Sequence, residues 1–308
     1  THGLTISPSP YWKIEIVYPD DQFCARGISR DSVRWLKFTI LLKPYDTNVV
    51  YFQDSRTYVF HYTFANEWLE PFQGMTTDQF NRVALFEEEQ QAVLGTVIFP
   101  PKASSTKPQI NEYGIQFVRQ DPYPRETIRD LFHLVQADIE APAEVQAFYF
   151  PTYEQQKATQ ANSDWFESEG ISLGSTARWA EGNVCYSEGW ALGHLKFVEA
   201  DGIDAAYHSG QLEPNDILLT DGIPAELPFL AGIISLAPST PNSHVAILAR
   251  TYGVPFAYLA LTDDADHVQT LVEHRIIFSA YEDEYGALDL RLMDIEETLD
   301  DAIVAALV

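Results

Sequence analysis

The sequence predicts two domains, an α+β domain over residues 1–165 that is rich in strands and an α/β domain over residues 166–308. Three observations support this prediction. Aromatic and β-branched runs recur through the first half, with two helical patterns among them. In the second half, short apolar strands alternate with short helices. Between the halves, residues 153–183 form a polar stretch of the composition found between domains.

The elements of the first domain are predicted from the period of their apolar residues. Between Trp12 and Tyr18, large apolar residues occupy alternate positions, as in a strand with one buried face. Further strands are predicted at residues 35–42, 49–52, 58–64, 93–99, 115–119 and 145–150. Two helices are predicted. One, at residues 77–86, is preceded by capping residues, and the other, at residues 125–138, begins directly after Pro124. The first domain is therefore expected to be a sheet or sandwich with two helices.

The polar stretch at residues 153–183 is predicted to be a linker or an exposed helix. Flexible or semi-rigid connections are expected at residues 155–163 and in the acidic tail after Asp289. The second domain is expected to begin with strands at residues 184–198. Its further elements are predicted as a helix at residues 201–208, a strand at 217–220, a helix at 224–231, a strand at 232–235, a helix at 245–251 and a strand at 254–259.

The composition indicates a globular chain, because 46% hydrophobic and 13% aromatic residues are enough for two cores. Forty-five acidic residues against 19 basic ones give a formal net charge of −26 at pH 7. Such a charge repels nucleic acid and anionic membranes, so neither is expected as a partner. Most of the acids are interpreted as a solvated surface rather than a recognition patch.

Cysteine usage and the absence of targeting patterns favour a cytoplasmic protein. Cys24 and Cys185 are far apart in the sequence, so a disulfide framework is not expected and a reducing compartment is favoured. The chain has no apolar run of the roughly 18 residues that a membrane span needs. Its first residues lack the basic and apolar regions of a signal peptide.

One histidine, His244, is predicted to stand where a strand, a turn and a helix meet. The strand at residues 232–235 is followed by a polar bend at 238–242 and by the helical pattern at 245–251. Free N–H groups and the positive end of the dipole at a helix N-terminus bind anions. A neutral imidazole nitrogen is a nucleophile toward a phosphoryl group, and the phosphoramidate that forms can pass the group on. His244 is therefore the candidate catalytic residue of a phosphoryl carrier.

Polar side chains beside His244 are candidates for binding the phosphate. The Ser243 hydroxyl and the side chains of Thr240 and Asn242 can donate hydrogen bonds to phosphate oxygens. Arg250 is expected to pair with an acid of the domain rather than with phosphate. Ser243 and His244 are not interpreted as a hydrolase pair, because neighbouring side chains point apart.

Three sequence motifs of the second half occur in the order found in a known family. Asn-Ser-His-Val-Ala-Ile-Leu-Ala-Arg occupies residues 242–250, and Tyr-Gly-Val-Pro follows at 252–255. Upstream lie Pro-Asn-Asp-Ile-Leu-Leu-Thr at 214–220, with Pro224 behind it, and Ser-Glu-Gly-Trp-Ala-Leu-Gly at 187–193. These motifs resemble those of the phosphoenolpyruvate-utilising enzymes, which include phosphoenolpyruvate synthase, pyruvate phosphate dikinase and Enzyme I of the sugar phosphotransferase system. The resemblance covers roughly residues 170–292. It implies a swivelling β/β/α phosphohistidine domain, the mobile domain of that family, behind an N-terminal domain of unknown ligand.

The motifs differ from the family pattern at three points. Pro-Ser-Thr-Pro at residues 238–241, with one extra residue, stands where the family has a Gly-Gly pair. Glu188 stands in place of a proline, and Asn242 in place of a threonine. Asn242 keeps a short polar side chain that is able to cap a helix. The nucleophile, His244, is retained.

The resemblance implies a phosphoryl-carrier segment of a phosphotransferase similar to phosphoenolpyruvate synthase or a dikinase, passing phosphate through His244. The 308 residues contain no Gly-rich phosphate-binding loop, so no cofactor is expected on this segment. ATP and Mg²⁺ are expected on a separate, ATP-grasp-like nucleotide-binding domain in the same parent chain or in a partner. The chain is accordingly interpreted as a piece of a longer enzyme that is not active alone. The alternative is a non-catalytic binding or assembly protein that keeps the phosphohistidine fold.

The other histidines and charged residues are interpreted without a catalytic role. His61 and His133 are expected to be hydrogen-bonded core or sheet-face residues. Residues 263–266 are expected to be an acidic capping turn, and His267 and His274 are too far apart for one metal ion, so no metal site is predicted. Four basic residues are candidates for contact with an anionic ligand, pairing with acids being the alternative: Arg26, Arg30, Lys102 and Lys107.

Overall fold

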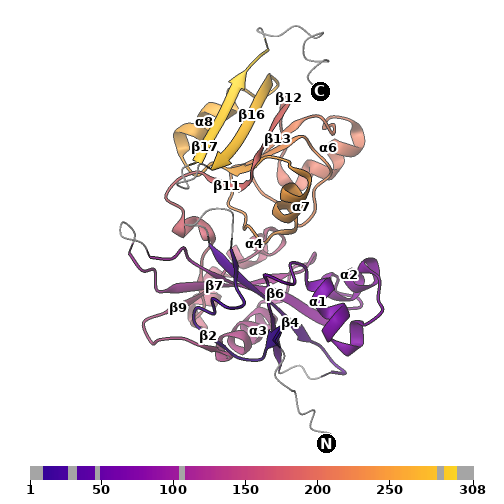
Figure 1. Cartoon of the computed structure of the whole chain (residues 1–308), viewed down its shortest axis with the longest axis vertical. Helices are drawn as coiled ribbons and strands as arrows, with labels where there is room; N and C mark the ends of the chain where they lie inside the picture. The colour runs from indigo at the N-terminus through magenta and orange to yellow at the C-terminus, as the bar shows by residue number, and fades with distance from the viewer. Residues whose placement is uncertain (1–9, 27–32, 46–48, 104–107, 283–287, 297–308) are drawn as a thin grey trace, which may run out of the picture. The chain divides into compact units, whose positions relative to one another are not determined.

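The protein is a strand-rich mixture of α-helices and β-sheets in two compact units. A computed structural model describes residues 10–26, 33–45, 49–103, 108–282 and 288–296 (Figure 1). Among these residues the two units divide between Ser175 and Thr176. None of the helices in the described ranges is long and apolar enough to cross a membrane.

The first unit is built on an eight-stranded, mostly antiparallel sheet with the strand order β1-β5-β4-β6-β7-β9-β10, and β3 beside β4. The bounds are Trp12–Lys13 for β1, Ala25–Arg26 for β3, Arg34–Leu41 for β4, Val50–Gln53 for β5, Ala92–Phe99 for β6, Glu112–Val118 for β7, Gln146–Tyr149 for β9 and Ser172–Leu173 for β10. The pairs β7–β9 and β9–β10 are parallel. Separately, β2 (Ile16–Val17) pairs in parallel with β8 (Ile139–Glu140).

Helices pack on both faces of this sheet, which is why every residue of β4 and β6 is buried. Phe38 and its face of the sheet share a core with Phe132 of α3 (Arg125–Ala137). Leu94 points the other way and shares a second core with α1 (His61–Trp68) and α2 (Thr77–Leu85). The predicted helix at 77–86 is α2, which begins at a capping box between Thr76 and Gln79.

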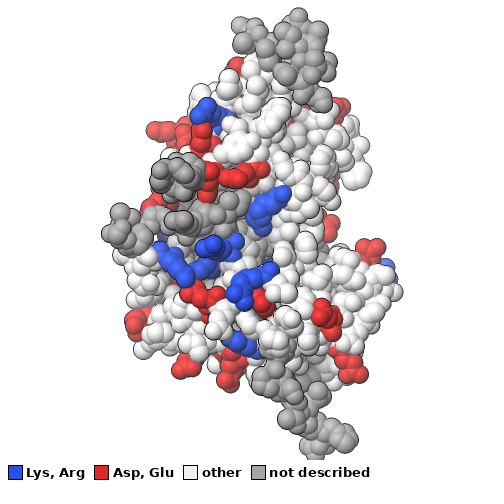
Figure 2. All heavy atoms as spheres, viewed as in Figure 1, with Lys and Arg blue, Asp and Glu red and all other residues white. Residues whose placement is uncertain are grey.

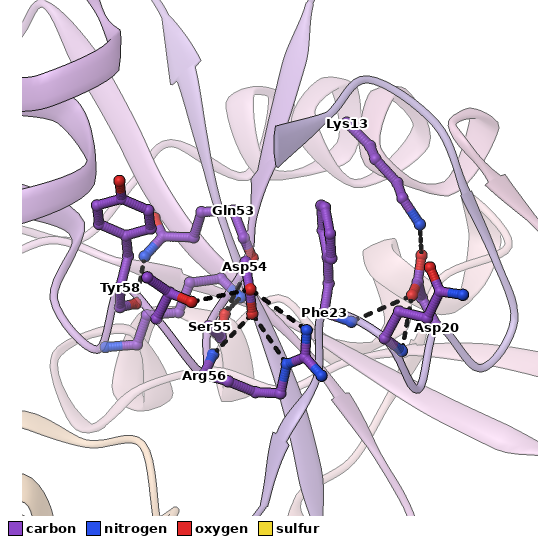
Figure 3. A network of polar contacts seen from close by, with 11 residues as sticks. Lys13, Asp20, Phe23, Gln53, Asp54, Ser55, Arg56 and Tyr58 are labelled. Carbon is purple, nitrogen blue, oxygen red and sulfur yellow. Dashed lines mark hydrogen bonds and ion pairs between the residues drawn. The ribbon is translucent and has the colours of Figure 1, made fainter. Parts of the chain in front are cut away.

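The strand predicted at residues 58–64 is wrong, because the chain turns after β5 and enters α1. Asp54 closes this turn, accepting hydrogen bonds from the Arg56 backbone N–H at 3.1 Å and from the Arg56 side chain (Figure 3). In α1, Phe64 and Ala65 are fully buried, and Leu69, the residue that follows the helix, is 4% exposed. That spacing suits one face of a helix, but a short aromatic run does not distinguish a helix from a strand by its period alone.

The flexible or semi-rigid connection expected at residues 155–163 is wrong, because this segment packs in the first unit. It is helical, as one of the two alternatives had it, and forms α4 (Tyr153–Gln160) and the start of α5 (Ser163–Ser168), but it is partly buried. Gln155 of α4 is fully buried and accepts a 2.7 Å hydrogen bond from the Tyr123 N–H. Its amide nitrogen donates to the carbonyl oxygen of Asp121 at 3.0 Å. Behind α4, Phe166 lies in the first unit's core and β10 pairs with β9, so this unit continues past the predicted boundary at residues 165–166.

The second unit contains a seven-stranded sheet with the order β11-β15-β14-β13-β12-β16-β17. The bounds are Val184–Ser187 for β11, Gly189–Phe197 for β12, Ile217–Thr220 for β13, Gly232–Ser235 for β14, Phe256–Tyr258 for β15, Arg275–Glu282 for β16 and Leu288–Asp294 for β17. The four inner strands from β15 to β12 are parallel, and β11, β16 and β17 pair antiparallel with their neighbours.

Two helices of the second unit pack on opposite faces of its sheet. Ile233 of β14 shares a core with α7 (His244–Tyr252), whereas the next residue, Ile234, shares a core with α8 (Thr262–Gln269). A short helix, α6 (Ile203–Ser209), follows β12. The chain passes from β14 through α7 to the parallel strand β15, as a β-α-β unit does.

One predicted element of the second unit differs from the structure and one agrees with it. The predicted helix at residues 224–231 is absent, and this described segment is an irregular connection. Pro228 lacks the N–H that a helix interior needs, and together with Pro224 it favours an extended chain. The strands predicted at 184–198 are present as β11 and β12, separated at Glu188. At Gly189, the first residue of β12, φ is +154° and an added Cβ would lie 2.7 Å from the carbonyl oxygen of Gly253.

The buried amide of Gln155 predicts a stability difference between two adjacent glutamines of α4. Gln155→Ala should lower the free energy of unfolding by about 2 kcal/mol, because it leaves the Tyr123 N–H and the Asp121 carbonyl without their partner. Gln156 is exposed, so Gln156→Ala is the matched control. Urea unfolding curves of the two variants and the parent protein provide the measurement. Equal midpoints for both variants would contradict the role of Gln155 in holding α4.

Candidate functional site

His244 is the first residue of α7, and its side chain is exposed. The helix begins there because Ser243 takes the N-cap conformation, with φ −61° and ψ 151°, and its Oγ accepts a 3.1 Å hydrogen bond from the Ala246 N–H. The Ile247 N–H bonds to the Ser243 carbonyl oxygen at 3.0 Å and begins the helical ladder. The imidazole is thus carried at the N-terminal end of a helix inside a β-α-β unit.

The three predicted phosphate-binding residues lie in the same turn, but they are not equally accessible. Ser243 is half-buried, and its hydroxyl already serves as the helix cap. Thr240 is 8% exposed and Asn242 is 5% exposed. The carbonyl oxygen of Thr240 accepts from the Ser243 N–H at 3.0 Å, which closes the turn. Of the four predicted site residues, His244 is therefore the one presented to solvent.

Tyr186 of β11 holds the loop in front of α7, a role that the sequence did not reveal. Its hydroxyl donates to the carbonyl oxygen of Ser239 at 2.9 Å and accepts from the N–H of the same residue at 3.0 Å. Thr176 Oγ1 donates a second bond to the Ser239 carbonyl oxygen, at 3.0 Å. Ser239 Oγ lies 3.2 Å from Ser243 Oγ and donates to it. These contacts join β11, the loop and the helix cap.

Arg250 supplies a second connection between β11 and the loop. Its guanidinium donates to the carbonyl oxygen of Tyr186 at 3.1 Å and to that of Pro241 at 2.6 Å. The expected pairing of Arg250 with an acid is therefore wrong: backbone carbonyl groups are its partners among the described residues. The position on α7 explains the choice, because the side chain reaches back along the helix toward its own entry loop.

Burial determines the protonation states around this loop. Burial raises the pKa of the Tyr186 phenol well above its ordinary value, so the hydroxyl stays protonated and can donate throughout the physiological range. Burial also lowers the pKa of the Arg250 guanidinium, which nevertheless stays charged because its ordinary pKa is so high. Burial raises the pKa of the Cys185 thiol to about 12, which makes it a poor nucleophile at neutral pH.

The two histidines interpreted as core residues have different environments. His61 lies on α1, partly buried, with Nε2 2.9 Å from the carbonyl oxygen of Gly95. Burial and the nearby Lys37 ammonium lower its pKa from 6.5 to about 3, so the ring is neutral. His133, by contrast, is exposed on α3, and the expectation that it lies in a core or on a sheet face is wrong. It falls on the outer side of the helix because Phe132 takes the buried position.

Of the two candidates for an anion site that the structure describes, Arg26 and Lys102, Lys102 pairs with an acid. Lys102 and Arg34 bind the two carboxylate oxygens of Asp21 at 2.7 and 2.6 Å. Figure 2 shows Lys and Arg side chains beside Asp and Glu side chains on the face that it draws. Arg26 is exposed, and Arg30 and Lys107 lie outside the described residues. For Lys102, pairing with an acid is therefore the alternative that the structure supports.

The acidic turn at residues 263–266 lies in α8, with Asp263 and Asp264 in its first turn. Asp264 accepts a 2.6 Å hydrogen bond from Asn183. Within the described ranges, no group of three or more His, Cys, Asp or Glu side chains is placed to hold a metal ion. Comparisons with protein-family models, with curated proteins and with solved structures found no match to this chain.

The capping bond of Ser243 predicts that this hydroxyl stabilises the start of α7. Ser243→Ala should lower the free energy of unfolding by about 1 kcal/mol, because the Ala246 N–H loses its acceptor. Thr262→Ala, at the exposed first residue of α8, removes a hydroxyl without removing a capping bond and is the control. Thermal unfolding and amide exchange in α7 test this. Unchanged exchange of the Ala246 amide would contradict it.

The neutral, partly buried ring of His61 predicts that part of the protein's loss of stability in acid comes from this residue. The unfolded chain takes up a proton on this histidine below about pH 6.5, whereas the folded chain does so only near pH 3, so stability falls as the pH drops between these values. Between pH 7 and pH 5 the loss should be about 1 to 2 kcal/mol. His61→Gln keeps a donor for Gly95 and should remove this component. If the free energy of unfolding fell by the same amount between pH 7 and pH 5 in His61→Gln and in the unsubstituted protein, His61 would not be the source of this loss.

Proposed function

We propose that the chain is a phosphoryl-carrier segment of a phosphotransferase similar to phosphoenolpyruvate synthase or a dikinase, with His244 as the carrier. The observation that carries this proposal is the exposed imidazole at the capped N-terminus of α7. It is supported by the resemblance of residues 242–250 and 252–255 to a phosphohistidine motif. A helix N-terminus favours the negative charge that arrives with a phosphoryl group.

The chemistry needs an imidazole with a free nitrogen lone pair. In the first transfer that nitrogen forms a bond to phosphorus, and the bond between phosphorus and the donor's leaving oxygen breaks. In the second, an acceptor oxygen attacks phosphorus, the P–N bond breaks, and the imidazole nitrogen regains its lone pair. The exposed side chain of His244 allows a donor and an acceptor to approach in turn.

The donor and acceptor sites are proposed to lie outside the described residues of this chain. ATP and Mg²⁺ belong to the donor site, an ATP-grasp-like domain in the same parent chain or in a partner. A carrier that visits two sites must move, and the second unit is proposed to be the swivelling β/β/α domain that does so. Its own cores and its own sheet support this, since such a unit can move as one body.

The test is phosphoryl labelling of His244. With a labelled phosphoryl donor and the intact parent protein, label should appear on this segment, survive base and be lost in acid, as a phosphoramidate does. His244→Ala should reduce the label to background. His267→Ala, which removes another exposed histidine of the second unit, should leave it unchanged.

Two results would contradict the proposal in different ways. Label at the parental level in His244→Ala would mean that another residue carries the phosphate. A parent protein that takes up no label at all would favour the alternative, a non-catalytic binding or assembly protein that keeps the fold.

A further inference from the structure

We propose that Tyr186 is a positioning residue for His244: it fixes the loop that enters α7, so that the imidazole meets the phosphoryl donor in a reactive orientation. The inference rests on the proposed function of His244 and adds to it a residue from a different strand. In this role Tyr186 acts through Ser239 and the helix cap.

The hydroxyl of Tyr186 constrains one loop residue from both sides. It donates to the Ser239 carbonyl oxygen at 2.9 Å and accepts from the Ser239 N–H at 3.0 Å. A single side chain therefore holds both backbone polar groups of one residue, which restricts rotation on either side of its Cα. Ser239 lies between β14 and α7, in a stretch that has no regular secondary structure to hold it.

The constraint continues from Ser239 to the first turn of α7 through hydroxyl groups. Ser239 Oγ donates to Ser243 Oγ at 3.2 Å, and Ser243 Oγ accepts from the Ala246 N–H at 3.1 Å. His244 directly follows Ser243, so its Cα and the direction of its side chain depend on this cap. Tyr186 itself is 3% exposed and packs its ring 4.8 Å from that of Phe256, centroid to centroid. The hydroxyl is consequently presented from a fixed place in the sheet.

Arg250 reinforces the same arrangement from the other end of the loop. It bonds the carbonyl oxygens of Tyr186 and Pro241, so β11 and the loop are joined twice. Loss of the phenol should therefore loosen the loop without releasing it. This predicts a variant that folds, keeps His244 exposed and loses the orientation needed for transfer.

The experiment compares Tyr186→Phe with Tyr258→Phe. Tyr258, on the neighbouring strand β15, lies in the same core at 8% exposure, and no side-chain hydrogen bond of its hydroxyl is found among the described residues. Both changes remove the phenol oxygen of a tyrosine whose ring lies in this core. Thr176→Val, which removes one of the two donors to the Ser239 carbonyl, is a milder variant in case Tyr186→Phe does not fold.

Two phosphorylation reactions separate orientation from exposure. Phosphorylation by potassium phosphoramidate needs only an exposed imidazole on a folded protein. This reagent should therefore phosphorylate His244 at similar rates in the unsubstituted protein and in both tyrosine variants. Transfer from the labelled donor in the intact parent protein needs orientation as well. In Tyr186→Phe this transfer should fall roughly tenfold, the scale of one lost hydrogen bond to a buried group, and in Tyr258→Phe it should stay within about twofold.

Each result has one meaning. Donor transfer that is undiminished in Tyr186→Phe overturns the positioning role and leaves the proposed function intact. Chemical loading that falls in step with donor transfer and with melting temperature also overturns it, because the effect is then general destabilisation. If the parent protein is loaded by phosphoramidate but not by the donor, the proposed function fails, and the positioning role fails with it.

Discussion

The parallel pairing of β14 with β13 on one side and β15 on the other is the constraint on which the second unit depends. All four residues of β14 are buried, and both of its edges are used in the sheet. A chain that leaves such a strand and returns parallel to it must cross over a face of the sheet, and α7 is that crossover. The crossover places the start of α7, and with it His244, at the carboxyl end of β14. Loops at this end of parallel strands are a common location for ligand sites.

The entry loop of α7 shows how an irregular segment is fixed by groups that belong to other elements. Its backbone polar groups are met by Tyr186, Thr176 and Arg250, so few of them have to find water or a ligand. The hydrogen bonds from strand β11 and from α7 offset much of the conformational entropy that the loop loses when it is ordered. The exposed imidazole therefore stands on an ordered backbone, the arrangement that a reactive group needs in order to act from one orientation.

The first unit uses buried polar side chains in a similar way, although for holding elements rather than for chemistry. Asp54 closes the turn after β5 and Asp20 binds Lys13 at 2.6 Å (Figure 3). Gln155 holds α4 by its hydrogen bonds. Each of these side chains is at least nine-tenths buried and has hydrogen-bond partners, so burial costs it little. Polar composition therefore does not always mark the surface of this unit, which is why residues 155–163 lie in the α4–α5 segment of the first unit. The division between the units, after Ser175, does fall within the polar stretch.

The sequence by itself determined the features that are encoded within a few residues: the capped helices α2 and α7, the buried strand β14, the alternation of strands and helices in the second half, and the place of His244 at a helix start. Only the tertiary structure decided those features of secondary structure and hydrogen bonding that depend on residues distant in the sequence. Residues 61–68 form a helix because a core is available for Phe64 and Ala65, whereas a short aromatic run by itself suits either a helix or a strand. Tyr186 and Ser239 are 53 residues apart, and a hydrogen bond over that separation leaves no period or motif in the sequence. For the same reason Arg250 took backbone carbonyl groups where an acid was expected, because only the folded chain brings those oxygens within reach.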